Sequence, residues 1–117
     1  MVKTIDAVDL IGKIVKALED KKAENVVALD LRQVSDSLDY FVIATGTSQP
    51  HLQALQDYVQ EQLRDEGVRP DAVEGPSSRW WLLSYGPVLV HIMSPEAREY
   101  YDLEGFWADA ARLPLPV

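Results

Sequence analysis

A Gly-Thr-Ser turn between an apolar segment and a helical pattern is the first part of this sequence whose residue types suggest chemistry. Gly46, Thr47 and Ser48 follow the apolar run 39–45, an arrangement seen in many phosphate-binding turns. Free backbone N–H groups and the positive end of a helix dipole would favour an anion there. However, the Walker pattern is absent, and no Lys or Arg occurs between Gly46 and Leu63. We therefore interpret the segment as a strand-to-helix turn capped by Thr47 or Ser48.

The carboxylates and histidines give no better catalytic pattern. Asp36 and Asp39 are three residues apart, whereas two metal-binding carboxylates on one strand face need alternate positions. Asp36 fits an Asx turn, and Asp39 fits a cap or a surface contact. His51 and His91 have no second His at ligand spacing, and the chain contains no Cys. No Gly-x-Ser-x-Gly elbow surrounds Ser48. The sequence therefore predicts no enzyme, no metal site and no cofactor.

The elements around these residues predict one α/β domain, residues 1–111, followed by a frayed tail at 112–117. Apolar spacing predicts helices over 4–22, from Ser48 to Gly67, and from Ser94 to about Glu104. Strands are expected at 26–31, 39–45, 80–85 and 88–93, with a short extended segment within 68–79. The strand-helix-strand order favours a parallel pair and the hairpin at Gly86-Pro87 an antiparallel one. We expect a mixed four- or five-stranded sheet with helices packed on it.

The hairpin carries more apolar residues than one buried face requires. Alternation divides its side chains between two faces of the sheet. One face carries Trp81, Leu83, Tyr85, Val88, Val90 and Ile92, and the other carries Trp80, Leu82, Ser84, Leu89, His91 and Met93. Either the helices cover both faces, or part of the second face is open. In the second case Trp80, Leu82 and Met93 form an apolar patch of the kind that marks an interaction site.

Charge and hydropathy narrow the class of partner. The net charge is −8, so a phosphate backbone would repel the chain and direct nucleic-acid binding is not expected. An acidic domain suits a basic protein partner. The alternative is that the acidic residues only increase solubility. No stretch approaches the roughly 20 apolar residues of a membrane span. We expect a soluble, cytoplasmic protein without a membrane partner.

Three segments carry a resemblance to a known family. "IVKALEDKKAENVVALDL" (14–31), "DYFVIATGTSQPHLQAL" (39–55) and "EGPSSRWWLLSYGPVLVHIMSPEAREYYDLEGFWADA" (74–110) resemble the ribosomal silencing factors, also called Iojap-like proteins. The resemblance implies a nucleotidyltransferase-like fold without the catalytic carboxylates. It also implies a factor that binds a basic protein on the subunit-joining face of the large ribosomal subunit, the fourteenth large-subunit protein. Binding there blocks association with the small subunit and represses translation.

This resemblance, together with pattern and expected exposure, suggests where the partner binds. We expect partner contacts at Trp80, Leu82, Tyr85, His91, Met93, Arg98, Tyr100 and Tyr101. The family often has Asp where this chain has Ser84 and Pro87, so the rim of the contact is expected to differ here. Two alternatives stay open. One is a nucleotide-binding module using the turn after residue 45, and the other is a homodimer formed through the open face.

Overall fold

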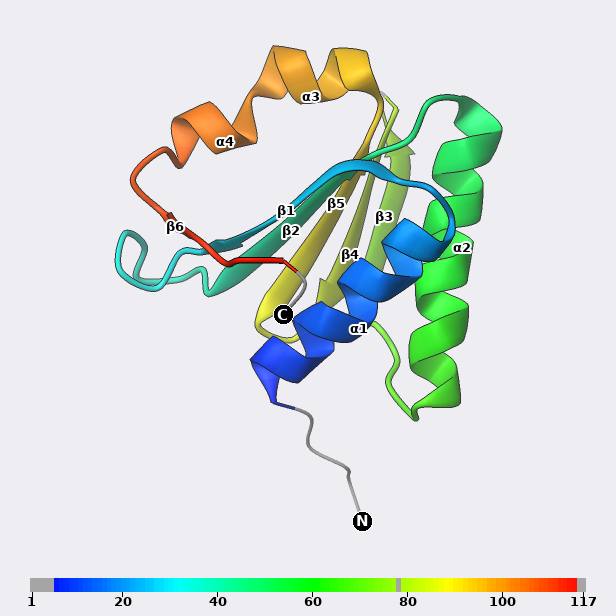
Figure 1. Cartoon of the computed structure of the whole chain (residues 1–117), viewed down its shortest axis with the longest axis horizontal. Coiled ribbons are helices and arrows are strands. Elements are labelled where there is room, and N and C mark those ends of the chain that lie inside the picture. Colours follow the sequence, from blue (N-terminus) through cyan, green and yellow to red (C-terminus); the bar gives the residue numbers. More distant parts are fainter. Residues whose placement is uncertain (1–5, 78, 116–117) are drawn as a thin grey trace.

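The structure is a computed structural model that describes residues 6–77 and 79–115 (Figure 1). In chain order, the helices are α1 (Ala7–Asp20), α2 (Gln49–Asp65), α3 (Pro95–Tyr101) and α4 (Leu103–Phe106). The strands are β1 (Glu24–Asp30), β2 (Tyr40–Thr45), β3 (Ala72–Ser77), β4 (Trp80–Tyr85), β5 (Val88–Met93) and β6 (Ala111–Arg112). The predicted α/β class is confirmed. The expected first residues of the N-terminal helix, from Thr4, lie partly outside the described residues, and Asp6 caps α1.

All six strands form one mixed sheet in the order β3-β4-β5-β2-β1-β6. The central pair, β2 and β5, is parallel, and every other pair is antiparallel, as the hairpin and the strand-helix-strand order predicted. The expected count of four or five strands is wrong. The added edge strands show little apolar alternation, since β3 is exposed throughout and contains Gly75-Pro76, while β6 has only 2 residues.

One face of the sheet is covered by α1 and α2, which Figure 1 shows side by side. Apolar residues at three- and four-residue spacing, among them Ile11, Ile14 and Leu18 of α1, are fully buried against it. The sheet contributes the first set of hairpin side chains predicted by alternation, from Trp81 to Ile92, and all of them are buried. This face is the main core and offers no surface to a partner.

The opposite face is covered only in part, by α3 and α4. A second core cluster joins them to the sheet and contains Leu29, Leu31, Phe41, Ile43, Met93 and Ala97. The helix expected to run to about residue 104 is interrupted at Asp102, which adopts φ 45° and ψ 55°. The Asp102 side chain accepts a hydrogen bond from the Gly105 N–H at 3.1 Å and so begins α4. The break lets the chain turn and bring Leu103 and Trp107 onto the sheet.

The end of the described chain is attached to the sheet. Arg112 pairs with Leu29 in the antiparallel register of β1 and β6, and the Leu113 N–H donates to the Ala28 carbonyl at 2.9 Å. Leu113 and Leu115 pack against the main core. Residues 112–115 therefore differ from the frayed tail predicted for 112–117, whose last two residues lie outside the described part.

Candidate interaction surface

The β3–β4 side of the second face carries no helix, and we call its exposed residues the open strip. They are Glu74, Trp80, Leu82, Ser84 and Leu89, all exposed or half-buried. Antiparallel pairing places Glu74 opposite Leu82 and Ser84 opposite Leu89. Directly opposed residues point to the same side of a sheet, so the strip is continuous from β3 to β5. Part of the hairpin's second face is therefore open, and of the three residues expected to form an apolar patch there, Trp80 and Leu82 are accessible and Met93 is buried.

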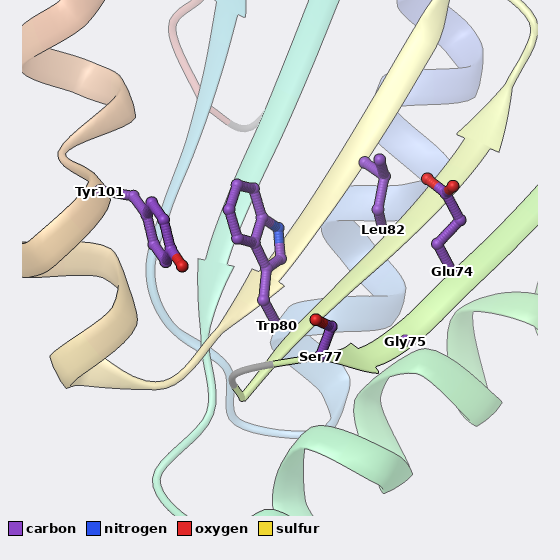
Figure 2. A pocket seen from close by; sticks show the side chains of 6 residues that line it. All are labelled: Glu74, Gly75, Ser77, Trp80, Leu82 and Tyr101. Carbon is purple, nitrogen blue, oxygen red and sulfur yellow. The ribbon is translucent and has the colours of Figure 1, made fainter.

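Trp80 is the central side chain of this surface and is held on two sides. Its indole Nε1–H donates a hydrogen bond to His91 Nδ1 at 3.2 Å, and the two ring centroids lie 5.5 Å apart. Its other neighbour is the Tyr101 ring of α3, at 4.8 Å between centroids (Figure 2). Offset aromatic contacts in this range add to the stability gained by burial. The indole is thus fixed in position while part of it stays exposed.

His91 lies beneath Trp80 and is only 5% exposed. Burial lowers the pKa of His91 to about 4, so the imidazole is neutral at pH 7. Because an indole N–H can only donate, the lone pair on Nδ1 accepts from Trp80 and the proton resides on Nε2. The imidazole also packs edge-on against Phe41, with ring centroids 4.4 Å apart. His91 therefore supports the surface rather than forming it.

Three aromatic side chains of α3 and α4 are exposed, and two of them, Tyr100 and Tyr101, extend the open strip beyond the sheet. Tyr100, Tyr101 and Phe106 have exposed fractions of 81%, 41% and 77%. Tyr100 contacts Tyr101 edge-on with ring centroids 5.0 Å apart, which joins it to Trp80 through Tyr101. Exposed aromatic residues are frequent at the centre of protein interfaces. The exposure of Phe106 was not predicted, because neither its spacing nor its neighbours indicate that it lies outside the core.

A groove of about 350 Å³ runs between Trp80 and the edge strand. Its walls are formed by Glu74, Gly75, Ser77, Trp80, Leu82 and Tyr101. Figure 2 shows Glu74 and Leu82 along one side, Trp80 in the middle and Tyr101 beyond it. The position of Glu74 in the groove was not predicted either, because its strand shows no alternation of apolar and polar residues. The groove combines two aromatic side chains with a carboxylate.

The structure brings together only some of the residues expected to contact the partner. Trp80, Leu82, Tyr100 and Tyr101 share the accessible surface. His91 and Met93 are buried beneath it, and Met93 is covered by the cluster that includes Ala97 of α3. Tyr85 lies on the opposite face under the helices, where burial raises its pKa to about 12. Tyr85 therefore has no access to a partner bound at the open strip.

Arg98 has a role within the fold. Its side chain is 12% exposed; Nε donates to Glu104 Oε1 at 2.8 Å and Nη1 donates to Thr45 Oγ1 at 2.9 Å. Glu104 also pairs with Arg112 at 3.3 Å, and the hydrogen bond from Arg98 holds the pKa of the Glu104 carboxyl below its usual range. Arg98 thus links β2, α3 and α4, and its expected partner contact is replaced by these internal bonds.

Replacing Arg98 with methionine is expected to lower the free energy of unfolding by about 1–3 kcal/mol, because buried Thr45 loses its donor and Glu104 loses one of two cations. Urea unfolding at pH 7 measures the change. The matched control is Arg79→Met, which removes an exposed ion pair of 3.9 Å with Glu96 and should cost roughly 0–1 kcal/mol. Equal losses in the two variants would contradict the structural role of Arg98.

The turn considered first as a phosphate site is closed by internal hydrogen bonds. Ser48 Oγ accepts from the His51 N–H at 3.2 Å, which confirms the capped strand-to-helix turn. His51 Nδ1 accepts from the Thr47 N–H at 2.9 Å, and Nε2 lies 2.8 Å from the Lys21 carbonyl oxygen. In the loop before β2, Ser35 accepts the turn hydrogen bonds that were expected at Asp36. Among the described residues, no group of three or more potential metal ligands occurs.

Comparison with known proteins identifies the family. The family model described as "Ribosomal silencing factor during starvation" matches residues 4–117. The chain belongs to this family. Ribosomal silencing factor RsfS of Halalkalibacterium halodurans is 36% identical over 108 residues, which cover 92% of each protein. The crystal structure of a Chromobacterium violaceum protein has a TM-score of 0.84 at 32% identity, with 97% of this chain and 94% of that chain covered.

A more distant relative comes from an animal. The mouse protein named mitochondrial assembly of ribosomal large subunit protein 1 is 33% identical over 101 residues, covering 83% of this chain and 44% of that protein. The names of these ribosomal silencing factors describe regulatory proteins of the ribosome rather than enzymes, as the sequence predicted. Within residues 6–77 and 79–115, no helix is long and apolar enough to span a bilayer.

Proposed function

We propose that this protein binds a basic protein on the subunit-joining face of the large ribosomal subunit and sterically blocks association with the small subunit. The observation that carries the proposal is the open strip, with Trp80 fixed in position and Tyr100 and Tyr101 exposed beside it. Membership of the family of ribosomal silencing factors supports a ribosomal target. The name of the mouse relative supports the large subunit. The fourteenth large-subunit protein is the proposed contact.

The charges around the open strip suit a basic partner. Glu74 on β3, Glu96 and Glu99 on α3, and Asp102 between the two short helices are all exposed. Of these, Glu96 is paired with Arg79 at 3.9 Å, and the whole chain carries a net charge of −8. Complementary charge accelerates encounter and excludes wrong partners, while buried aromatic contacts supply most of the affinity. The surface therefore has both features that a basic protein contact requires.

The proposed inhibition needs no chemical step. A domain seated on the subunit-joining face prevents joining whenever its volume overlaps the position of the small subunit. Repression of translation then depends on affinity and concentration alone. The cytoplasmic location and the distant relation of the fold to nucleotidyltransferases belong to the same proposal, and both rest on the family resemblance.

Sedimentation of purified protein with isolated ribosomal subunits tests this function. We expect the protein to sediment with the large subunit, not with the small one, and the fraction of joined ribosomes to fall as protein is added. Binding to both subunits alike, or binding without any loss of joined ribosomes, would contradict the proposed block. Light scattering over a concentration series should be run in parallel, because a stable dimer that hides the open strip would also contradict it.

A further inference from the structure

Glu74 is an exposed carboxylate next to an aromatic side chain. Antiparallel pairing places Glu74 opposite Leu82, and Trp80 lies two residues before Leu82 on the same strand. The register with β4 shifts between Glu74 and Ser77, so the side chains of Glu74 and Trp80 are related by the groove that both of them line and not by a regular diagonal spacing. Among the ion pairs of the described residues, none involves Glu74. Its charge is therefore free to pair with a group that enters the groove.

At Gly75 the edge strand lies so close to β4 that no side chain would fit. A Cβ atom added there would lie 2.7 Å from the Trp80 carbonyl oxygen, and Gly75 adopts φ +125°. The strand therefore passes close to Trp80 without a side chain at this position. With Leu82 and Tyr101 on its walls, the groove has a volume of about 350 Å³. This volume accepts one long side chain and excludes a folded element.

We propose that this groove receives a single arginine side chain of the basic partner, with the guanidinium stacked on Trp80 and paired with the carboxylate of Glu74. The proposal rests on the proposed function, of which it names the recognition chemistry. A planar guanidinium stacks on an aromatic face and donates two parallel hydrogen bonds to a carboxylate. A lysine ammonium has neither property, so the geometry favours arginine.

The indole of Trp80 is held in position before an arginine side chain binds. The hydrogen bond from Trp80 Nε1 to His91 and the contact with Tyr101 fix the indole, so little side-chain freedom is lost on association. On α3, Glu99 is exposed, while the charge of Glu96 is paired with Arg79 at 3.9 Å. The negative net charge of the chain favours a cationic ligand.

A titration with a small probe tests the groove without the ribosome. Acetyl-arginine amide is added to ¹⁵N-labelled protein, and the indole N–H signal of Trp80, assigned by its loss in Trp80→Phe, is followed. We expect this signal to shift and Glu74→Gln to weaken the apparent affinity about three- to tenfold. Glu61→Gln, at an exposed position of α2 on the other face of the sheet, makes the same change in charge and should have no effect. Equal shifts with uncharged acetyl-citrulline amide would overturn the proposal.

Binding to the large subunit separates this proposal from the function on which it rests. Glu74→Gln should weaken subunit binding at least threefold relative to Glu61→Gln, with the two variants equally folded. If both bind as the unaltered protein does, the arginine site is wrong and the proposed function stands. If the unaltered protein does not bind the subunit, the proposed function fails, and the probe titration still decides whether the groove takes a guanidinium.

Discussion

Replacing Trp80 with alanine is expected to weaken binding to the large ribosomal subunit by about 2 kcal/mol or more, roughly a 30-fold loss of affinity. Trp80 is the largest side chain of the open strip and is fixed by His91 and Tyr101 before any partner arrives. Truncation removes its contact area and also frees Tyr101, its stacking neighbour. Fluorescence anisotropy of the labelled protein, titrated with purified large subunits, gives the dissociation constants of both forms.

The control for this substitution is an aromatic residue on the other side of the molecule. Tyr58 of α2 is partly buried against the main core and lies on the face away from the open strip. Tyr58→Ala should leave subunit affinity unchanged while costing some stability. Circular dichroism must show that both variants are folded at the assay temperature. An unchanged affinity of folded Trp80→Ala would place the partner elsewhere on the surface.

The two faces of the hairpin were predictable because strand alternation has a fixed period. Once Gly86-Pro87 was identified as the turn, the period of two assigned every side chain of β4 and β5 to a face, and the structure confirms that assignment. The same rule separates Tyr85 from Trp80, so Tyr85 had no place among the expected contacts.

Which part of the second face is open depends on the path of the chain after β5, and local pattern does not determine that path. The left-handed conformation of Asp102 ends α3, and α4 then returns over the sheet. Met93 is buried in the cluster that includes Ala97 of α3, while Leu82 stays half-exposed, although the two have equivalent positions in the alternation. Arg98 is likewise drawn inward by Thr45, a residue 53 positions away. Such long-range contacts have no signature within a short segment.

The groove could not be predicted because one of its walls is an edge strand of unusual sequence. The segment "AVEGPS" has no apolar alternation, and its register with β4 shifts between Glu74 and Ser77. Gly75 and Pro76 are normally read as a loop. Pairing with β4 makes the segment a strand, and only that pairing places Glu74 beside Leu82. The position of the Glu74 carboxylate at the proposed arginine site therefore depends on the tertiary structure.

His91 should make folding stability depend on pH in a range where exposed carboxylates contribute little. Burial lowers the pKa of His91 from its ordinary value of 6.5 to about 4 in the folded protein. Between these values the unfolded chain binds a proton that the folded chain does not, so stability is full above pH 6.5 and falls as the pH drops toward 4. Over this pH interval, the titration of His91 is expected to lower the free energy of unfolding by an amount on the order of 3 kcal/mol.

A non-titrating replacement isolates this effect. Asparagine at position 91 keeps an acceptor for the Trp80 N–H but binds no proton, so the stability of His91→Asn should lack this component of the pH dependence. Urea unfolding of both proteins between pH 7 and pH 4 measures the difference, and the carboxylates common to both cancel. Parallel loss of stability in the two proteins would show that the pKa of His91 is not lowered in the fold, so that the imidazole becomes protonated below about pH 6.5 in the folded protein as well. Protonation would place a donor opposite a donor and release the indole that forms the centre of the open strip.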